Sequence, residues 1–425
     1  MQKIFDKKVS YLIYFFPLFL ILGPAIPDLI LSLFSILFLY YCLLNKNFKL
    51  FKNKIFYCYL IFWIIIVLSS ILSDLKVISL KQSLFHIRFL IFGFFLYLLI
   101  KKNDDFFKNF FPFFFLTLLV TVIDGYYQFF FDVNLLGFER PYANQRLSGF
   151  FGDEWILGSY LLRILPIFLC VYFLNPRKNN FLLLIFIFFY VILIFLSGER
   201  TSFFLLIFFI LILIIFLRFS KVYKISALIL LLIIPITIIN INEDMRERMF
   251  NQIFVGFGIF EEKPTDGENP RKIICCKMPK YIFSLGHTKH YEVAYKMFLD
   301  KPLFGHGLKS FRYKCKDFQK DIGCSSHPHN TYIQLLAESG IISFTIVLML
   351  FFFFCYLLLK NYLNKIKINL NIYNARVCIL GSFIINLFPL VPSGNFFTNW
   401  LNVIYFLPFG FLLYLYNYPL NEKKN

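Results

Sequence analysis

Charged residues are scarce in this chain: of its 425 residues, 16% are charged, 59% are hydrophobic and 21% are aromatic. Soluble domains carry about 25% charged residues and about 45–50% apolar ones. The apolar residues also come in long blocks and lack the alternation of an amphipathic strand or helix. This pattern excludes a soluble globular enzyme, a disordered chain and a small disulfide-rich secreted domain. Together with a mean hydropathy of +0.70, it predicts an all-α polytopic membrane protein.

Twelve apolar blocks are candidate membrane spans, since a helix needs about 20 apolar residues to cross the bilayer core. The first two are separated at Gly23–Pro27, where a helix cannot continue. No small-x-small cleavage site follows the first block, so we expect it to be retained and not to be a signal peptide. The predicted spans are Tyr11–Leu22, Pro27–Leu44, Ile55–Leu72, Gln82–Ile100, Phe110–Phe130, Trp155–Leu174, Phe181–Leu196, Thr201–Leu217, Ile225–Ile241, Gly340–Leu359, Val377–Leu390 and Trp400–Tyr416.

Positive charges predict the orientation of these spans. The chain has 43 Lys and Arg against 24 Asp and Glu, a net charge of +19. Lys and Arg gather at every second connection and at both termini, whereas intervening connections such as Asp132–Glu154 are neutral or mixed. By the positive-inside rule both termini are cytoplasmic and the long loop after the ninth span is outside, so the excess charge does not indicate a nucleic-acid partner. We expect nine spans in 1–241, a loop domain in 242–339 and three spans in 340–425.

The sequence of the outer loop predicts a turn at Glu261–Pro270, followed by a helix at Tyr291–Leu299. It contains no CxxC pair, so a zinc site is not expected. Cys315 and Cys324 are separated by one short loop. They can pair in an oxidising compartment, and two free thiols are the alternative.

Ionisable residues inside spans cost about 2.5–3.5 kcal/mol each on insertion scales, so each calls for a reason. We expect Arg88 about two turns inside the fourth span, with His86 nearby, and Arg163 at a similar depth in the sixth. Asp124 is expected near the outer end of the fifth span. Structural ion pairs and snorkelling side chains are one explanation. Arginines that converge on a lipid-linked phosphate are the other, because a guanidinium binds phosphate through two hydrogen bonds and keeps its charge.

The dipeptide His329-Asn330 opens a short helical pattern that Gly340 can end. A helix start disfavours an imidazolium, which lowers the pKa of the histidine and keeps the ring neutral near pH 7. A neutral histidine beside the membrane can act as a general base, and a purely structural histidine is the alternative. Upstream, Gly305-x-Gly307 lacks the third glycine and the Lys spacing of a phosphate loop, so it is more typical of a tight turn.

Three stretches carry a family resemblance: Arg146–Glu154, Ser197–Thr201, and a third that runs from Lys301–Gly305 through His329-Asn330 to Gly340. They resemble the O-antigen ligase and O-antigen polymerase superfamily of bacterial envelope glycosyltransferases. The third stretch is the most specific, because the family's ligases also carry His-Asn, nine residues and then glycine. With the spans and the long outer loop, the resemblance covers essentially the whole chain.

The resemblance implies a GT-C-type fold and a metal-independent, inverting glycosyltransferase of the bacterial inner membrane that uses no cofactor. Its donor would be a glycan on undecaprenyl pyrophosphate at the periplasmic side, and its acceptor lipid A-core or a second lipid-linked glycan. His329 matches the family's catalytic histidine, and Arg200 matches its arginine on the hairpin between the seventh and eighth spans. A further family arginine in the large loop is absent, and His287, Lys289 or His290 stands in its place.

In this scheme His329 takes the proton of the acceptor hydroxyl, and arginines oppose the charge of the leaving pyrophosphate. For Asp153 and Glu154, a role in orienting the sugar or an arginine and a solvated surface position are equal alternatives. The candidate substrate-binding residues are Arg88, Arg146, Asp153, Glu154, His287, Lys289 and Asn330.

Three functions stay open on these grounds. A ligase would transfer a finished O-antigen to lipid A-core, and the His-Asn spacing favours it. A polymerase would join repeat units that are both lipid-linked. A transporter suits the number of spans, but the polar residues gather on one side of the membrane and no matched pair of interrupted helices is visible.

Overall fold

The computed structural model describes residues 7–46, 48–52, 54–140, 146–177, 179–251, 285–319, 324–363 and 369–417. Within these residues the chain is helical, with a single isolated β-bridge between Val133 and Glu139. Eight of the described helical stretches are long and apolar enough to cross a membrane. The all-α polytopic class is therefore confirmed. The turn predicted at Glu261–Pro270 lies outside the described residues.

The helices follow the apolar blocks closely, because a backbone inside a bilayer can satisfy its polar groups only through internal hydrogen bonds. The described helices are α1 (Lys7–Tyr14), α2 (Phe16–Ile21), α3 (Ala25–Leu44), η2 (Lys49–Phe51), α4 (Lys54–Ile71), α5 (Lys76–Leu84), α6 (Ile87–Lys102), α7 (Phe106–Phe131), η3 (Gly149–Phe151), α8 (Leu157–Leu174), α9 (Asn180–Leu196), α10 (Arg200–Phe216), α11 (Lys221–Ile241), α12 (Glu243–Arg246), η4 (Glu247–Asn251), α14 (Leu285–Asp300), α15 (Phe311–Phe318), α16 (Thr331–Leu363), α17 (Leu370–Asn386) and α18 (Asn399–Tyr416).

The predicted number of twelve spans stays a prediction. Eight of the twelve blocks correspond to the stretches that are long enough to cross. The first block is divided between the short helices α1 and α2, and three others form α9, α10 and α17, which have 17 residues each.

The predicted fourth span, Gln82–Ile100, lies within Lys76–Lys102, one of the stretches long enough to cross a membrane. This stretch is interrupted by a turn at Phe85 and His86, which divides it into α5 and α6. Two side chains of α4 bind the backbone at this turn. Tyr59 donates its hydroxyl to the carbonyl of His86 at 2.8 Å, and Trp63 donates its indole N–H to the carbonyl of Ser83 at 3.0 Å. The same two carbonyls accept from the backbone N–H groups of Phe89 and His86, at 3.2 and 3.1 Å, so the side chains of α4 add a second hydrogen bond to each.

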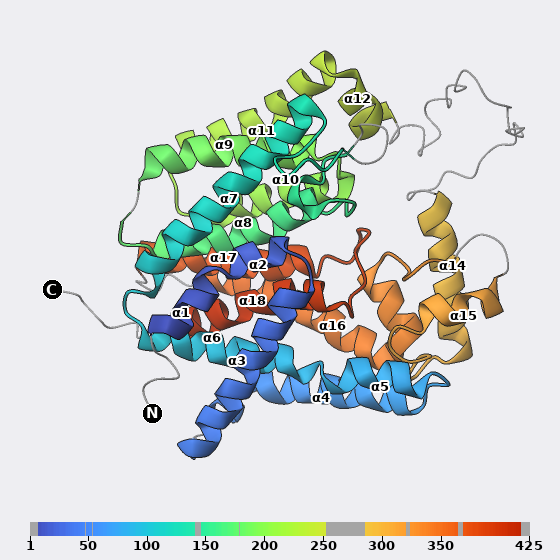
Figure 1. Ribbon diagram of the computed structural model, residues 1–425. Coiled ribbons are helices and arrows are strands. Elements are labelled where there is room, and N and C mark those ends of the chain that lie inside the picture. The colour runs from blue at the N-terminus through green and yellow to red at the C-terminus, as the bar shows by residue number, and fades with distance from the viewer. Residues whose placement is uncertain are drawn as a thin grey trace, which may run out of the picture.

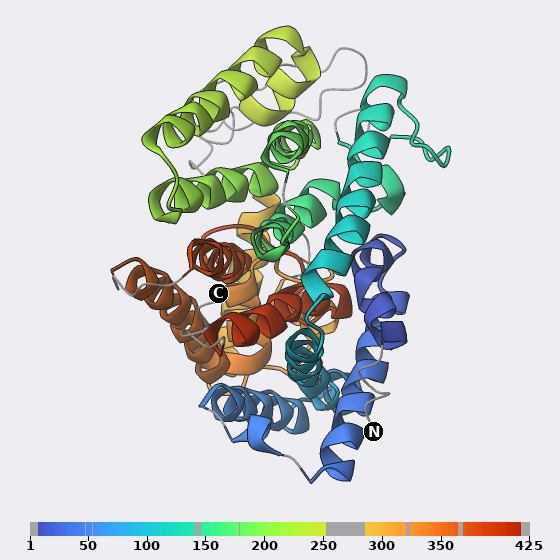
Figure 2. The same cartoon turned by 90° about the vertical axis from the view of Figure 1, so that its left-hand side faces the viewer.

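The two C-terminal helices lie in the middle of the bundle. In Figure 2, α17 and α18 are seen between the N-terminal helices α3 to α6 and the group that contains α8 and α10. Helix α17 packs against α8, α10 and α16, and α18 packs against α6 and α3. Every residue from Ile372 to Asn386 of α17 is buried, whereas only 6% of the apolar window of α11 is buried. The loop between α17 and α18 is therefore fixed by its two central helices.

Helices α14 and α15 lie together at one end of the molecule, beside α5 and the start of α16 (Figure 1). Helix α14 spans Leu285–Asp300 and so begins earlier than the predicted Tyr291–Leu299. Its early start brings His287 and His290 into a helix, where a spacing of three places them on one face.

Candidate functional site

His329 occupies the loop directly before α16 in a backbone conformation that L-residues rarely adopt, with φ of +59°. The backbone N–H of Ser393, in the loop between α17 and α18, donates to the carbonyl of His329 at 2.8 Å. The hydroxyls of Thr331 and Ser393 lie 2.9 Å apart in a second hydrogen bond. A strained residue persists only where its surroundings hold it, and here the α17–α18 loop does so.

Asn330 connects the same two segments through its side chain. Its amide N–H groups donate to the carbonyls of Pro389 and Val391, at 2.9 and 3.1 Å. Its carbonyl oxygen accepts from the backbone N–H groups of Tyr332 and Ile333, at 2.9 and 3.1 Å, which caps the start of α16. Asn330 was expected to bind substrate, but its hydrogen bonds in the structure position His329.

Three histidines surround His329, the catalytic candidate. The ring centroid of His329 lies 4.0 Å from that of His327, 5.4 Å from that of His287 and 5.3 Å from that of His290. His327 was not singled out from the sequence, and His290 was named only as a substitute for the missing loop arginine. We call His329 and these three residues the histidine cluster. Among the described residues, no group of three or more His, Cys, Asp or Glu is arranged to hold a metal ion.

Burial lowers the pKa of three rings of the histidine cluster, those of His329, His327 and His287. Burial is the largest cause that lowers the pKa of His329 to about 3, and His327, His287 and His290 lower it further. Burial likewise lowers the pKa of His327 to about 4. The sequence predicted a lowered pKa from the start of α16, but the structure assigns the shift to burial and neighbouring imidazoles. A neutral imidazole keeps a nitrogen lone pair, so His329 can accept a proton.

The hairpin between α9 and α10 is built around the buried carboxylate of Glu199. It accepts from the backbone N–H groups of Gly158 and Ser159, at 2.7 and 3.2 Å, and from the hydroxyl of Ser202 at 2.9 Å. Gly158 approaches so closely that a Cβ there would lie 2.3 Å from the hydroxyl of Ser197. The carboxylate therefore joins the start of α8 to the start of α10, which fixes the position of Arg200.

Two further arginines converge on this hairpin. The guanidinium of Arg146 lies 5.1 Å from the ring centre of Trp155, and the Nε of Arg248 donates to the carbonyl of Gly198 at 3.2 Å. Arg248 was missed from the sequence, although its place in the charged run after the ninth predicted span was an available signal.

Arg146 and Arg200 are electrostatically coupled to the histidine cluster. Burial, then His290, Arg200 and Arg146 lower the pKa of His287. The positive charges of Arg146 and Arg200 thus act on the cluster from the side of His287.

An apolar cavity of about 420 Å³ lies next to the hairpin, between α7, α9 and α11. Phe129, Ile192, Ile233 and Ile238 contribute to its wall, and so does Leu196, the last residue before the hairpin. Its wall is mostly apolar, so it suits a hydrocarbon chain, and Leu196 precedes Arg200 by four residues in the sequence.

Lys289 forms an ion pair with Glu292 at 2.9 Å, while the rings of His287 and His290 contact the ring of His329. Asp153 and Glu154 are exposed, and neither side chain has an ion pair or hydrogen bond in the described part of the chain.

Arg88 lies in the first turn of α6, and its guanidinium forms a 2.7 Å ion pair with Asp28 of α3. Such an ion pair was one of the two expected explanations. Arg163 is buried nearly two turns into α8 and donates to the hydroxyl of Ser159. Asp124 accepts the backbone N–H of Leu135 at 2.8 Å.

The glycines of the third motif have a packing role. Gly340 has a φ of +76° and divides α16 into two helical parts, as the sequence predicted. A Cβ at Gly340 would lie 2.1 Å from the carbonyl oxygen of Leu303, and one at Gly305, where φ is +65°, would lie 2.5 Å from the backbone of Glu338. The two glycines therefore allow two backbone segments to cross closely, which places the 301–310 loop against α16 near Glu338 and Gly340.

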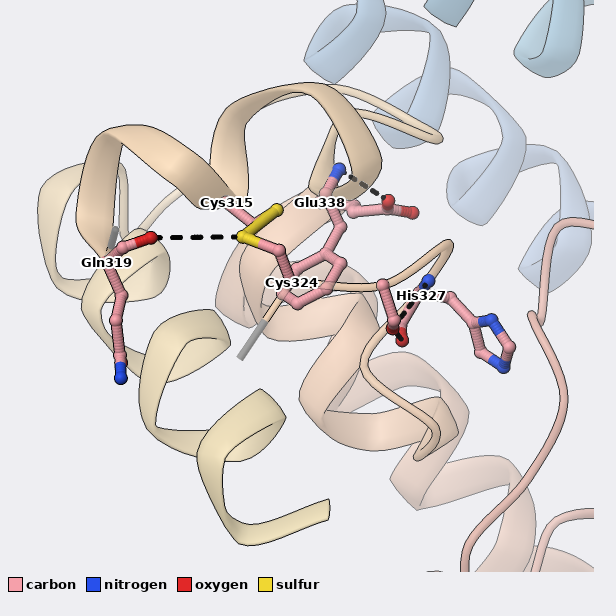
Figure 3. Close-up of a disulfide and its surroundings, with 7 residues drawn as sticks. Cys315, Gln319, Cys324, His327 and Glu338 are labelled. Atoms are coloured by element: carbon pink, nitrogen blue, oxygen red, sulfur yellow. Dashed lines mark hydrogen bonds between the residues drawn. A yellow bond between two sulfur atoms is a disulfide. The ribbon is translucent and has the colours of Figure 1, made fainter. Parts of the chain in front are cut away.

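Cys315 and Cys324 form a disulfide, with their Cα atoms 5.5 Å apart. Figure 3 shows that this bond joins α15 to the segment that leads to His327, with Glu338 of α16 close by. The disulfide thus connects α15 to the segment just before His327, a member of the histidine cluster.

Residues 182–348 match the family model described as O-antigen ligase. The matched range includes the α9–α10 hairpin, α14 and His329, and no curated protein matches the chain. This match agrees with the resemblance to the O-antigen ligase superfamily that the motifs carry. Together with the membrane helices, it indicates a membrane protein of the glycosyltransferase type.

Proposed function

We propose that this protein is an O-antigen ligase. It transfers a glycan from undecaprenyl pyrophosphate to a hydroxyl of lipid A-core at the periplasmic face of the bacterial inner membrane, without a metal. One observation carries the proposal: neutral His329 lies in a cluster whose neighbour His287 is coupled to Arg146 and Arg200, within the part of the chain that matches the family.

In the proposed reaction, His329 takes the proton of the acceptor hydroxyl while that oxygen attacks the anomeric carbon of the donor glycan. The bond between this carbon and the pyrophosphate oxygen breaks, and undecaprenyl pyrophosphate leaves with the electron pair. Attack from the face opposite the leaving group inverts the anomeric centre. Arg146 and Arg200 stabilise the growing negative charge, which is the charge-stabilising role that a metal has in other transferases.

The low pKa of His329, about 3, has a consequence for the order of events. Such a weak base does not deprotonate an alcohol in advance. Proton transfer therefore accompanies cleavage of the donor bond, when the leaving pyrophosphate becomes negative and stabilises the forming imidazolium nearby.

The apolar cavity between α7, α9 and α11 supports the choice of donor, since a polyprenyl chain needs apolar surface next to the cations that bind its pyrophosphate. The alternation of Lys and Arg along the chain supports a periplasmic site with cytoplasmic termini.

The test is a lipopolysaccharide gel from a deletion strain that carries either the wild-type protein or His329→Ala. For a ligase, the deletion gives core without O-chain, with polymer retained on undecaprenyl pyrophosphate, and only the wild type restores the ladder. Core with a single repeat unit would instead identify a polymerase. An unchanged deletion profile would contradict both enzymes and favour the transporter. A normal ladder with His329→Ala would disprove the role of His329 as base.

A further inference from the structure

A second group of positive charges reaches the histidine cluster from another side. Arg146 and Arg200 act on His287, whereas Arg312, at the start of α15, acts on His327. Lys309, three residues before Arg312, is electrostatically coupled to Arg312 and to Lys81 of α5. These residues come from an outer-loop segment and from the connection between α4 and α6, so they are unrelated to the α9–α10 hairpin.

Backbone contacts hold Lys309 over α5. The hydroxyl of Ser79, in α5, donates to the carbonyl of Leu308 at 3.0 Å, and the hydroxyl of Ser73 donates to the carbonyl of His306. Lys309 itself has a φ of +59°, a conformation that costs energy in a residue other than glycine. Its position is therefore determined by packing and does not result from a freely rotating surface loop.

The buried carboxylate of Glu338 offsets part of the charge of Lys309. None of the ion pairs among the described residues, however, involves Lys81, Lys309 or Arg312. By contrast, two other lysines of the same loop region, Lys301 and Lys314, both pair with Asp74. The oxygens of Glu338 accept hydrogen bonds from the backbone N–H groups of Phe311 and Lys309 and from the side-chain amide of Gln334.

Lys309 is also partly buried, and burial is the largest cause that lowers its pKa, followed by Arg312. One buried carboxylate, that of Glu338, does not neutralise three neighbouring cations, so an anion that binds between them relieves their repulsion. Phosphate is the anion that suits a guanidinium fork and two ammonium groups.

We propose that Lys81, Lys309 and Arg312 form a second anion site, which binds a phosphate group of the acceptor glycolipid. This inference rests on the proposed function, in which Arg146 and Arg200 hold the pyrophosphate of the donor. Separate cations on the two sides of His329 allow two anionic lipid-linked substrates to meet at one base without mutual repulsion. The acceptor phosphate belongs either to a phosphorylated core sugar or to the carrier of a second lipid-linked glycan.

Binding of inorganic pyrophosphate to the full chain in lipid nanodiscs tests the number of sites. We expect two sites in the wild type. The double variant Lys309→Gln/Arg312→Gln retains one, and Arg146→Gln/Arg200→Gln retains the other. Lys316→Gln, which removes an exposed charge from the same helix α15, retains both. A single site in the wild type, or two sites in Lys309→Gln/Arg312→Gln, would overturn the proposal.

Kinetics identify the source of the phosphate. For the acceptor that this enzyme uses, the KM of Lys309→Gln/Arg312→Gln should be higher than that of the wild type by about tenfold for each cation removed. The KM for the donor should be unchanged. The increase appears with phosphorylated lipid A-core if a core phosphate binds, and with a lipid-linked glycan if carrier phosphate binds. It disappears with an acceptor that lacks phosphate. An unchanged KM for both phosphorylated acceptors would contradict the proposal.

The two proposals fail in different ways. If the wild type forms no product from any donor and acceptor, the proposed function is wrong, and the number of pyrophosphate sites alone decides the second anion site. If product forms but only one pyrophosphate site exists, the proposed function stands and the second anion site is wrong.

Discussion

The α9–α10 hairpin and the loop that carries His329 contribute to one site in different ways. The hairpin places Arg200 directly after a tight turn, and the apolar helices on both sides of it are evident in the sequence. His329 lies before an equally evident helix, but its strained backbone is held by Ser393, more than sixty residues further along the chain. A cation can be positioned by a local turn, whereas this base depends on a loop fixed by two central helices.

The largest expected effect concerns the loop that carries His329. His329→Ala removes the proposed base and should lower kcat by about 10²–10⁴-fold, because proton transfer then depends on water. The measurement is transfer of labelled glycan by the purified protein. Thermal unfolding of the same preparation serves as the control for folding. A variant that folds normally and keeps more than half of the wild-type kcat would show that His329 is not the base.

The second effect tests the hairpin. Arg200→Gln should lower kcat by about 10²-fold, since one stabilising charge on the leaving group is lost, and Arg200→Lys should recover part of the loss. Arg246→Gln is the matched control, because Arg246 forms an exposed ion pair with Glu243. Equal losses in Arg200→Gln and Arg246→Gln would mean that Arg200 has no specific role.

A third prediction sharpens the difference between local and distant support for His329. Asn330→Ala removes two hydrogen bonds to the α17–α18 loop and the cap of α16, so the free energy of unfolding should fall by about 2–3 kcal/mol. Ser393→Ala keeps its backbone hydrogen bond to His329 and loses one hydroxyl contact, which should cost about 1 kcal/mol. Denaturant unfolding of both variants measures the difference. A larger loss in Ser393→Ala would contradict the assigned support.

The smallest effect concerns acid stability. In the folded protein burial lowers the pKa of His327 from 6.5 to about 4. Between these values the unfolded chain binds a proton that the folded one does not, so stability is complete above about pH 6.5 and falls as the pH decreases. The slope is at most about 1.4 kcal/mol per pH unit for this residue. Unfolding measured from pH 7 to pH 5 should show a shallower slope for His327→Gln. An identical slope in both proteins would refute this.

Long apolar blocks made the helices predictable, since each helix satisfies its own backbone and needs no distant partner. The break between α5 and α6 was not predictable in this way. Trp63 and Tyr59 of α4 donate to the carbonyls of Ser83 and His86 at this break, and no short-range pattern near residue 85 encodes these contacts. The same limit explains why the pairing of Arg88 with Asp28 was not foreseen.

For the site, the sequence by itself determined the residues whose role depends on local chemistry: His329 before a helix, Arg200 after a turn, and Gly340 where the helix must end. Only the tertiary structure decided which residues surround them. It brought the rings of His287 and His290 to His329, and it added His327, Arg248 and Ser393. The physical reason is that helix formation depends on neighbours three or four residues away, whereas the environment of a buried imidazole depends on packing between segments far apart in the chain.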